Sequence, residues 1–254
     1  HTIASELVRR AGADGIPLRV RNLAVPATVN LQTATQLASR LLWDDPPDLI
    51  VVYDGANDLA LQESLAARGL GDSDRPASLV DAEFDEILRE RARERNAEAG
   101  LPAPVETTAP APELTPGELG ERVVTRYGNG VALIRRAAVE ADVPVVFFWQ
   151  PDLRAKAPLS EVDRSTLADV GIDESTIPGW RALSDRVRTA LPGLGVEDLT
   201  TVYDGREDAL YWDTVHTNET GSLLVAEAMY LRLLPQLLAA RSSAPAGGPE
   251  PGAP

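Results

Sequence analysis

Short apolar runs alternate with stretches of helical periodicity along this chain. The two strongest runs are Leu-Ile-Val-Val at 49–52 and Val-Pro-Val-Val-Phe-Phe-Trp at 143–149. Runs this short, rich in β-branched and aromatic residues, are typical of buried parallel strands. Together with two weaker patterns, they predict four strands, over residues 18–23, 48–53, 143–149 and 196–203.

Apolar residues recur at helical spacing between these strands. We expect helices over residues 2–10, 32–42, 118–141, 163–170, 180–191 and 219–238. Strands and helices that alternate in this way predict an α/β fold: a three-layer, doubly wound parallel sheet of flavodoxin-like type with helices on both faces. The chain opens directly on a helix, so we expect the strand that feeds this helix to be absent from residues 1–254.

Residues 64–120 interrupt the alternation and are expected to form an insertion over the mouth of the site. Within it, 79–99 mixes acidic and basic side chains and predicts a solvated helix. Residues 101–117 are rich in Pro, Ala, Thr and Glu and have too little apolar surface to order themselves. The insertion is either a mobile lid or a surface excursion. We expect residues 1–241 to form one domain and 242–254 to be a disordered tail.

The charge balance narrows the class of partner. A formal net charge of -15 at pH 7 argues against binding to nucleic acid or to an anionic membrane surface. The longest apolar stretch, 223–240, is interrupted by Glu227, Arg232, Pro235 and Gln236, so we expect a packed helix there and no membrane span. The expected partner is a small or neutral molecule.

Two residue types are scarce enough to limit the chemistry. The chain has no cysteine, which removes disulfides, thiolate metal sites and cysteine nucleophiles. Of its two histidines, His1 is terminal, which leaves His216 as the one internal imidazole. A single histidine among scattered carboxylates is poor material for a metal site, so we expect no metal and no cofactor.

Polar residues follow one strand and precede the last helix. Asn57 comes just after the strand 48–53, at the end where an open α/β sheet has its crevice. Near the other terminus, Asp213 lies three residues before His216, close enough to orient an imidazole that acts as a base. Taken alone, such an Asp-x-x-His pair more often caps a helix. Beside Asn57, Asp58 is expected to bind backbone N–H groups, and Asp54 is a candidate second acid.

Three segments together resemble the SGNH (GDSL) hydrolases in their order and in their positions at strand ends. They are Asn22-Leu23-Ala24-Val25-Pro26, Gly55-x-Asn57-Asp58 and Asp213-x-x-His216, the last followed by Gly221. The resemblance implies a serine-type carboxylic ester hydrolase, esterase- or lipase-like, that works through an acyl-enzyme. It also implies roles for four residues: His216 as base, Asp213 as the acid that orients it, and Asn57 and the backbone N–H of Ala24 as oxyanion donors.

The chain departs from the family pattern at two places. Ala24 stands where the family has glycine, but it keeps the backbone N–H. The first block, Gly-Asp-Ser, is missing from its place; the literal Gly71-Asp72-Ser73 follows no apolar strand, and we read it as coincidence. Ser5 lies within the first helix, with its hydroxyl expected to face solvent or a backbone carbonyl. We therefore expect the nucleophilic serine upstream of His1, and residues 1–254 alone to be inactive.

Two other functions stay open. The same residues can transfer an acyl group to or from a sugar, as in a carbohydrate O-acetyltransferase or deacetylase, or the scaffold can serve as a non-catalytic binding module. The expected partner is a small-molecule or glycan ester. The sequence does not specify the substrate-binding residues, the oligomeric state or the compartment, and any export signal or anchor is expected upstream.

Overall fold

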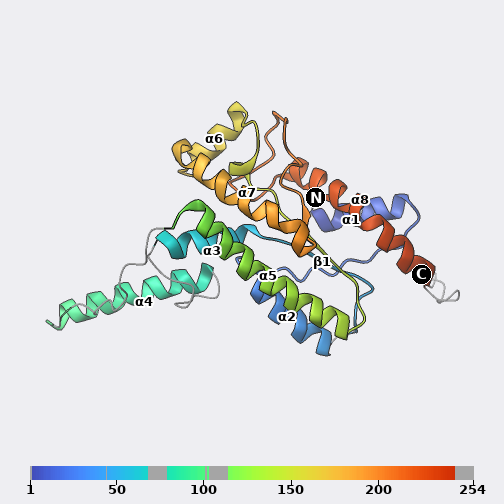
Figure 1. The fold of residues 1–254 in the computed structure, drawn as a ribbon, viewed down its shortest axis with the longest axis horizontal. Helices are drawn as coiled ribbons and strands as arrows, with labels where there is room; N and C mark the ends of the chain where they lie inside the picture. The colour runs from blue at the N-terminus through green and yellow to red at the C-terminus, as the bar shows by residue number, and fades with distance from the viewer. Residues whose placement is uncertain (1, 44, 68–78, 101, 103–113, 244–254) are drawn as a thin grey trace, which may run out of the picture.

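The computed structural model describes residues 2–43, 45–67, 79–100, 102 and 114–243. Figure 1 shows how the helices surround a small central sheet. In chain order the elements are α1 Ile3–Ala13, α2 Asn30–Trp43, β1 Ile50–Asp54, α3 Ala56–Ala67, α4 Leu79–Glu98, α5 Pro116–Glu140, β2 Val145–Trp149, η1 Leu153–Ala155, α6 Glu161–Asp169, η2 Glu174–Thr176, α7 Ile177–Leu194, β3 Glu197–Asp198 and α8 Glu219–Ser243.

The sheet in the described residues has three parallel strands in the order β1-β2-β3. β1 and β2 pair over their full length, from Ile50 opposite Val145 to Asp54 opposite Trp149. β3 is short and pairs only with the end of β2. The helix α5 lies between β1 and β2 in the chain, and α7 between β2 and β3, which is the connection that parallel strands require. The expected α/β class with a parallel sheet is thus observed.

Helices cover both faces of the sheet, because neighbouring side chains of β2 enter different cores. Phe147 and Trp149 lie in a core with residues of α2, α5 and α7. Phe148 lies in a second core with residues of α1, α6 and α8. Successive side chains of a strand point to opposite faces, so a strand that is apolar throughout is buried on both. The result is the expected arrangement of three layers.

The predicted strand at 18–23 is wrong for the described structure. Residues 16–25 carry no strand, and Val20, Leu23 and Val25 are 40%, 40% and 45% exposed. Within the described residues, β1 is paired on one side only, and Val51 is 38% exposed. A strand exists only through hydrogen bonds to a neighbour, and the segment 18–23 has none beside it. The fourth strand is therefore missing although its pattern is present.

Several other boundaries differ from the predicted ones, and for β3 and α5 the structure shows the cause. β3 spans 197–198 rather than 196–203, because Asp198 accepts the N–H and the hydroxyl of Thr200 and turns the chain away from the sheet. α5 begins earlier than expected, because Thr115 and Glu118 form a capping box in front of Pro116.

The charged helix expected at 79–99 is present as α4, and Figure 1 shows it projecting away from the sheet and its helices. Its residues Ile87 and Leu88 are each 49% exposed. Most of the Pro-rich segment 101–117, and the tail from 244, lie outside the described residues.

The last helix, α8, packs beside α1 and contributes Val225, Met229 and Leu233 to the second core. By length and composition alone, residues 219–241 would also suffice to cross a membrane, a test that core helices of soluble proteins pass as well. On its outer side, Leu231 is 60% exposed.

Candidate functional site

Near the C-terminal end, the carboxylate of Asp213 is hydrogen-bonded to the imidazole of His216. Nδ1 of His216 lies 2.6 Å from Oδ2 of Asp213. The other carboxylate oxygen accepts the backbone N–H groups of Val215 and His216, at 2.8 and 2.7 Å. The N–H of Trp212 donates to the carbonyl of His216 at 2.7 Å, which closes the loop. One aspartate thus fixes both the turn and the ring.

The electrostatics of this pair favour an ionised acid. Burial would raise the pKa of Asp213, but the N–H groups of His216 and Val215 and the imidazole outweigh it, so the pKa lies below its ordinary value. An ionised Asp213 selects the tautomer with the proton on Nδ1 and leaves Nε2 with a lone pair. The His216 side chain is 77% exposed, so this lone pair can reach a substrate or a nucleophile.

Asn57 is positioned by a tight junction between β1 and α3. Gly55 has φ +117°, and a Cβ there would lie 2.5 Å from the ring of Trp149, so only glycine fits. The chain enters α3 at the next residue, which places Asn57 in the first turn of the helix. Its Nδ2 donates one hydrogen bond to the carbonyl of Thr28 at 2.9 Å. An amide nitrogen carries two hydrogens, so the second can serve an oxyanion.

Ala24 lies in the exposed segment that follows the unformed strand. Its backbone N–H donates to Oδ1 of Asn22 at 3.0 Å. This donor is therefore engaged within its own loop, and serving an oxyanion requires Asn22 to release it. Three residues on, Ala27 adopts φ 58°, a left-handed conformation that non-glycine residues seldom take.

The loop that carries His216 rests on the segment that follows β2. The N–H of Leu153 donates to the carbonyl of Thr214 at 2.8 Å. β2 lies beside β1 in parallel register, so the ends of the two strands are neighbours. Asn57 follows β1 by three residues. Asn57 and the His216 loop therefore lie at the same carboxyl edge of the sheet, where α/β proteins bind their ligands.

One comparison with known proteins identifies a family for this chain. A sequence model of the family described as GDSL-like Lipase/Acylhydrolase matches residues 2–229. The chain belongs to this family. No curated protein and no solved structure matches it. The family assignment confirms the resemblance to SGNH (GDSL) hydrolases, whose members are typically ester hydrolases.

The family's reaction needs a nucleophile, and the described serines do not supply one beside His216. Ser5 donates to the carbonyl of Thr2 at 2.9 Å in the capping box of α1, which is the local role expected for it. Ser73, in the literal Gly-Asp-Ser, lies outside the described residues. Among the residues that the structure describes, no serine hydroxyl hydrogen-bonds to the imidazole of His216.

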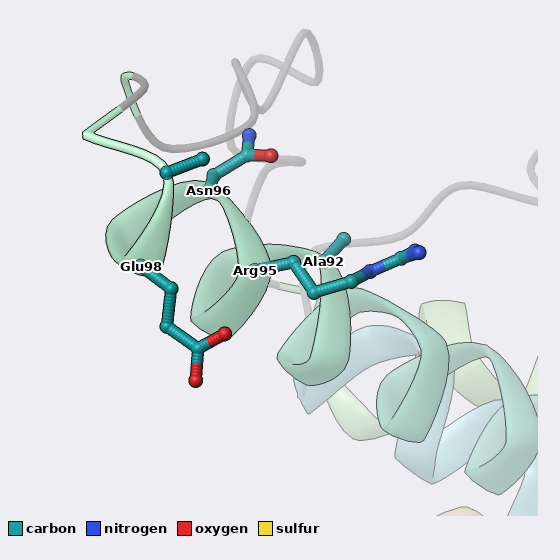
Figure 2. Close-up of a pocket in the computed structure, with 5 residues that line it drawn as sticks. Ala92, Arg95, Asn96 and Glu98 are labelled. Atoms are coloured by element: carbon teal, nitrogen blue, oxygen red, sulfur yellow. The ribbon is translucent and has the colours of Figure 1, made fainter.

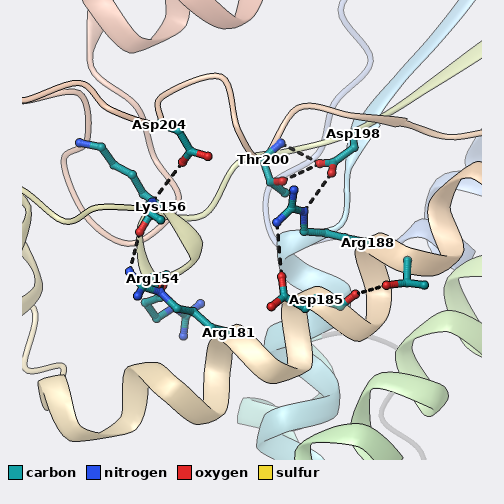
Figure 3. A network of polar contacts seen from close by, with 10 residues as sticks. Arg154, Lys156, Arg181, Asp185, Arg188, Asp198, Thr200 and Asp204 are labelled. Carbon is teal, nitrogen blue, oxygen red and sulfur yellow. Dashed lines mark hydrogen bonds and ion pairs between the residues drawn. The ribbon is translucent and has the colours of Figure 1, made fainter.

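Polar contacts fix the segment after β2, on which the His216 loop rests, and Figure 3 labels three of the residues involved, Arg154, Lys156 and Arg181. The guanidinium of Arg154 donates twice to Asp152, at 3.0 and 2.7 Å, and lies 3.2 Å above the ring of Trp180. Arg181 donates to the carbonyls of Arg154 and Lys156. Sequence reasoning missed the contacts of Arg181, because this residue lies 27 and 25 positions along the chain from Arg154 and Lys156.

A second group that sequence reasoning missed lies beneath Asn57. Asp58 is buried and accepts the backbone N–H of Asn30, at 3.1 and 3.3 Å, in keeping with its expected bond to backbone N–H groups. Asp54 accepts the side-chain amide of Asn30 and the hydroxyl of Tyr127, each at 2.8 Å. No sequence signal marks Asn30 or Tyr127 as partners of these acids.

One surface hollow of the described structure lies away from these residues. Figure 2 shows a surface hollow near the end of α4, lined by Ala92, Arg95, Asn96, Glu98 and Ala99. It contains none of the predicted site residues. In the described part of the chain, no three His, Cys, Asp or Glu side chains are grouped so that they could hold a metal ion.

Proposed function

We propose that the protein is a serine-type carboxylic ester hydrolase that works through an acyl-enzyme. The observation that carries the proposal is the Asp213–His216 pair, with Nδ1 held by the carboxylate and the ring open to solvent at the edge of the sheet that bears Asn57. This is the arrangement that a base requires in acyl transfer. Membership of a lipase and acylhydrolase family supports it.

In the proposed reaction, a serine hydroxyl attacks the ester carbonyl while Nε2 of His216 takes its proton. The tetrahedral oxyanion is stabilised by the Asn57 amide and the Ala24 N–H, donors that are worth about 3 kcal/mol each in other hydrolases. His216 then protonates the leaving alcohol, and the acyl group remains on the serine. Water attacks the acyl-enzyme with His216 again as base, which releases the acid and restores the serine.

We propose that the nucleophile lies at the end of a strand upstream of His1. Within the described residues, β1 has an unpaired edge, and Val51 on this strand is 38% exposed. A parallel strand paired with that edge would bury Val51 and would end at the carboxyl edge of the sheet. A serine at its end would reach the neighbourhood of His216 and Asn57.

Labelling with a fluorophosphonate, which reacts with activated serines, tests both statements. The natural protein, extended upstream of His1, is expected to be labelled and to hydrolyse p-nitrophenyl acetate, and both signals should disappear in His216→Ala. Residues 1–254 alone should be inert. Activity of residues 1–254 that is lost in His216→Ala would place the nucleophile within this chain instead.

An extended protein that is neither labelled nor active would refute the hydrolase proposal and leave a binding module on the same scaffold. If labelling succeeds, adding a glycan acceptor separates hydrolysis from acyl transfer. We expect release of free acid whether or not the glycan is present. Acyl glycan formed at the expense of free acid would instead identify an O-acetyltransferase.

A further inference from the structure

Four elements meet at the acid group beneath Asn57. Asn30 begins α2, Asp54 ends β1, Asp58 lies in the first turn of α3, and Tyr127 lies in the middle of α5. Asn30 bridges the two acids, since its backbone N–H reaches Asp58 and its side-chain amide reaches Asp54. Asn30 and Tyr127 are fully buried. The group is therefore a rigid joint between the sheet and three helices.

The joint holds two carboxyls with little to compensate two negative charges. None of the interactions that shift their pKa values comes from a Lys or Arg of the described residues. Burial raises the pKa of Asp54 to about 6, against the lowering effect of Asn30 and Tyr127. Burial, with the nearby charge of Asp54, raises the pKa of Asp58 well above its ordinary value. Two carboxyls this close share a proton rather than both ionising.

The donors decide which acid keeps the charge. Asp54 accepts a side-chain hydrogen bond on each of its two oxygens, from Tyr127 and from Asn30. Both bonds require it to be an acceptor, which favours its carboxylate form. Asp58 accepts only backbone N–H groups and is the more buried. At neutral pH the proton therefore belongs on Asp58.

The joint also holds the Asn57 amide from two sides. Asp58 is the next residue along α3, and Thr28, which accepts the amide hydrogen, lies two residues before Asn30. Asn30 cannot shift toward α5, because its side chain lies directly against Gly130. A Cβ added to Gly130 would lie only 1.9 Å from Oδ1 of Asn30. That oxygen is buried without a hydrogen-bond partner among the described residues, a cost that a joint serving packing alone would avoid.

We propose that Asn30, Asp54 and Asp58 are positioning residues, which set the direction of the Asn57 amide through the hydrogen bonds that join the start of α2 to β1 and α3. This inference rests on the proposed function in one respect: it takes Asn57 as an oxyanion donor. At lower pH the pair takes up its second proton, which goes to Asp54. The oxygens of Asp54 then no longer accept equally from Tyr127 and Asn30, and the hydrogen bonds that hold segment 28–30 weaken.

NMR of residues 1–254 tests the proposal without requiring activity. The side-chain amide of Asn57, labelled with ¹⁵N and assigned by its loss in Asn57→Ala, is followed between pH 5 and 8. We expect its shift to titrate with a midpoint near the pKa of Asp54, about 6. Asp58→Asn imitates the protonated acid and should leave the neutral-pH shift in place, whereas Asp54→Asn should move it and remove the titration. Asn129→Ala, an exposed asparagine of α5, is the matched control and should titrate as wild type does.

An Asn57 amide that does not respond to pH in the unaltered chain would overturn the proposal, even if Asp54→Asn fails to fold. Equal displacement by Asp58→Asn and Asp54→Asn would also overturn it. In an active extended protein, Asn30→Ala should lower kcat at least tenfold with KM within about twofold, since it misplaces a donor whose full loss costs about 10²–10³. If fluorophosphonate labelling fails while the NMR titration is observed, the acid joint stands and only the catalytic role of Asn57 is lost.

Discussion

At the residue scale, Asp213 carries two tasks on its two oxygens. Oδ1 accepts the N–H groups of Val215 and His216 and makes the turn, while Oδ2 accepts the imidazole. The turn would form with asparagine in this place, because an amide oxygen accepts the same N–H groups. The hold on the imidazole would not survive, because the amide nitrogen would then face Nδ1 as a donor.

Asp213→Asn is therefore expected to preserve the fold and to damage catalysis. In the extended, active protein, kcat should fall by about 10³–10⁴, with a much smaller change in KM, because the imidazole is forced into the wrong tautomer. Steady-state kinetics measure the effect, and Asp208→Asn, an exposed acid five residues away, is the control. A kcat within twofold of wild type would exclude Asp213 as the orienting acid.

The pH profile of the same enzyme follows from the role of His216. Only neutral imidazole accepts the serine proton, so kcat/KM should rise with pH as the ring loses its proton, and then level off. The lowered pKa of Asp213 keeps this acid ionised throughout that range, so it adds no second step. A kcat/KM that does not change with pH would contradict His216 as the base.

The sequence specifies site residues unequally. Asn57, Asp213 and His216 could be predicted because each pattern is local, a few residues at the end of one element. Asn30 and Tyr127 are not found, because they join the site through hydrogen bonds to an acid 24 and 73 residues away in the chain. Such bonds follow from the packing of α2 and α5, which no local pattern specifies.

At the scale of elements, the junction between β1 and α3 depends on one glycine. Gly55 has a left-handed φ and lies against Trp149, whose ring also makes an edge contact with Tyr127 at 4.8 Å between centroids. Any side chain at residue 55 must push the indole out of the core or change the backbone. Either movement displaces the first turn of α3, and Asn57 with it.

Gly55→Ala is expected to lower the free energy of unfolding by about 2–4 kcal/mol, through steric overlap and the cost of positive φ for alanine. Urea unfolding measures it. Gly12→Ala is the matched control, because Gly12 lies inside α1 and has open space around it. The free energy of unfolding of this variant should rise by about 0.5–1 kcal/mol. Equal stability of the two variants would show that Trp149 moves aside without cost.

The elements were predictable to different degrees for one physical reason. Helices α1, α5 and α8 make their own hydrogen bonds, so apolar periodicity was sufficient to predict them, although not their exact ends. The segment 18–23 also has a strand pattern, yet a strand depends on a neighbour, and none is present among the described residues. A pattern of alternating side chains indicates that a segment fits a sheet, and the sheet itself must supply the partner.

At the scale of the whole molecule, the layered architecture follows from which strands are apolar on both faces. β2 reads as apolar throughout, and the structure buries Phe147 and Phe148 in different cores. The composition alone therefore predicts two helical layers. The direction in which α4 projects was beyond prediction, since a solvated charged helix has no apolar face that would dock it on the rest of the chain (Figure 1).

The balance of charges across the whole chain predicts how stability depends on pH. Asp54 and Asp58 have raised pKa values in the fold, so the native state binds more protons than the unfolded chain as pH rises above about 4, and stability falls through that range. Three other acids, Asp213, Glu118 and Asp173, have lowered pKa values because their carboxylates accept hydrogen bonds, which for Asp213 outweigh the effect of burial. The stability that these ionised acids contribute is lost as pH falls below about 4. Self-repulsion of a chain with net charge -15 grows with pH as well.

The free energy of unfolding of residues 1–254 should therefore be greatest between about pH 4 and 6, and lower by about 2 kcal/mol at pH 8. Urea titrations at fixed ionic strength measure it. Salt screens the repulsion between surface charges but has much less effect on the interaction between two buried acids. The loss of unfolding free energy above pH 6 should therefore become only partly smaller at 0.3 M NaCl. Asp54→Asn removes the buried acid whose pKa is about 6 and should flatten the curve, while Asn129→Ala should leave it unchanged. Stability that rises steadily from pH 5 to 8 would mean that the two acids lie in water, and that the joint beneath Asn57 is open.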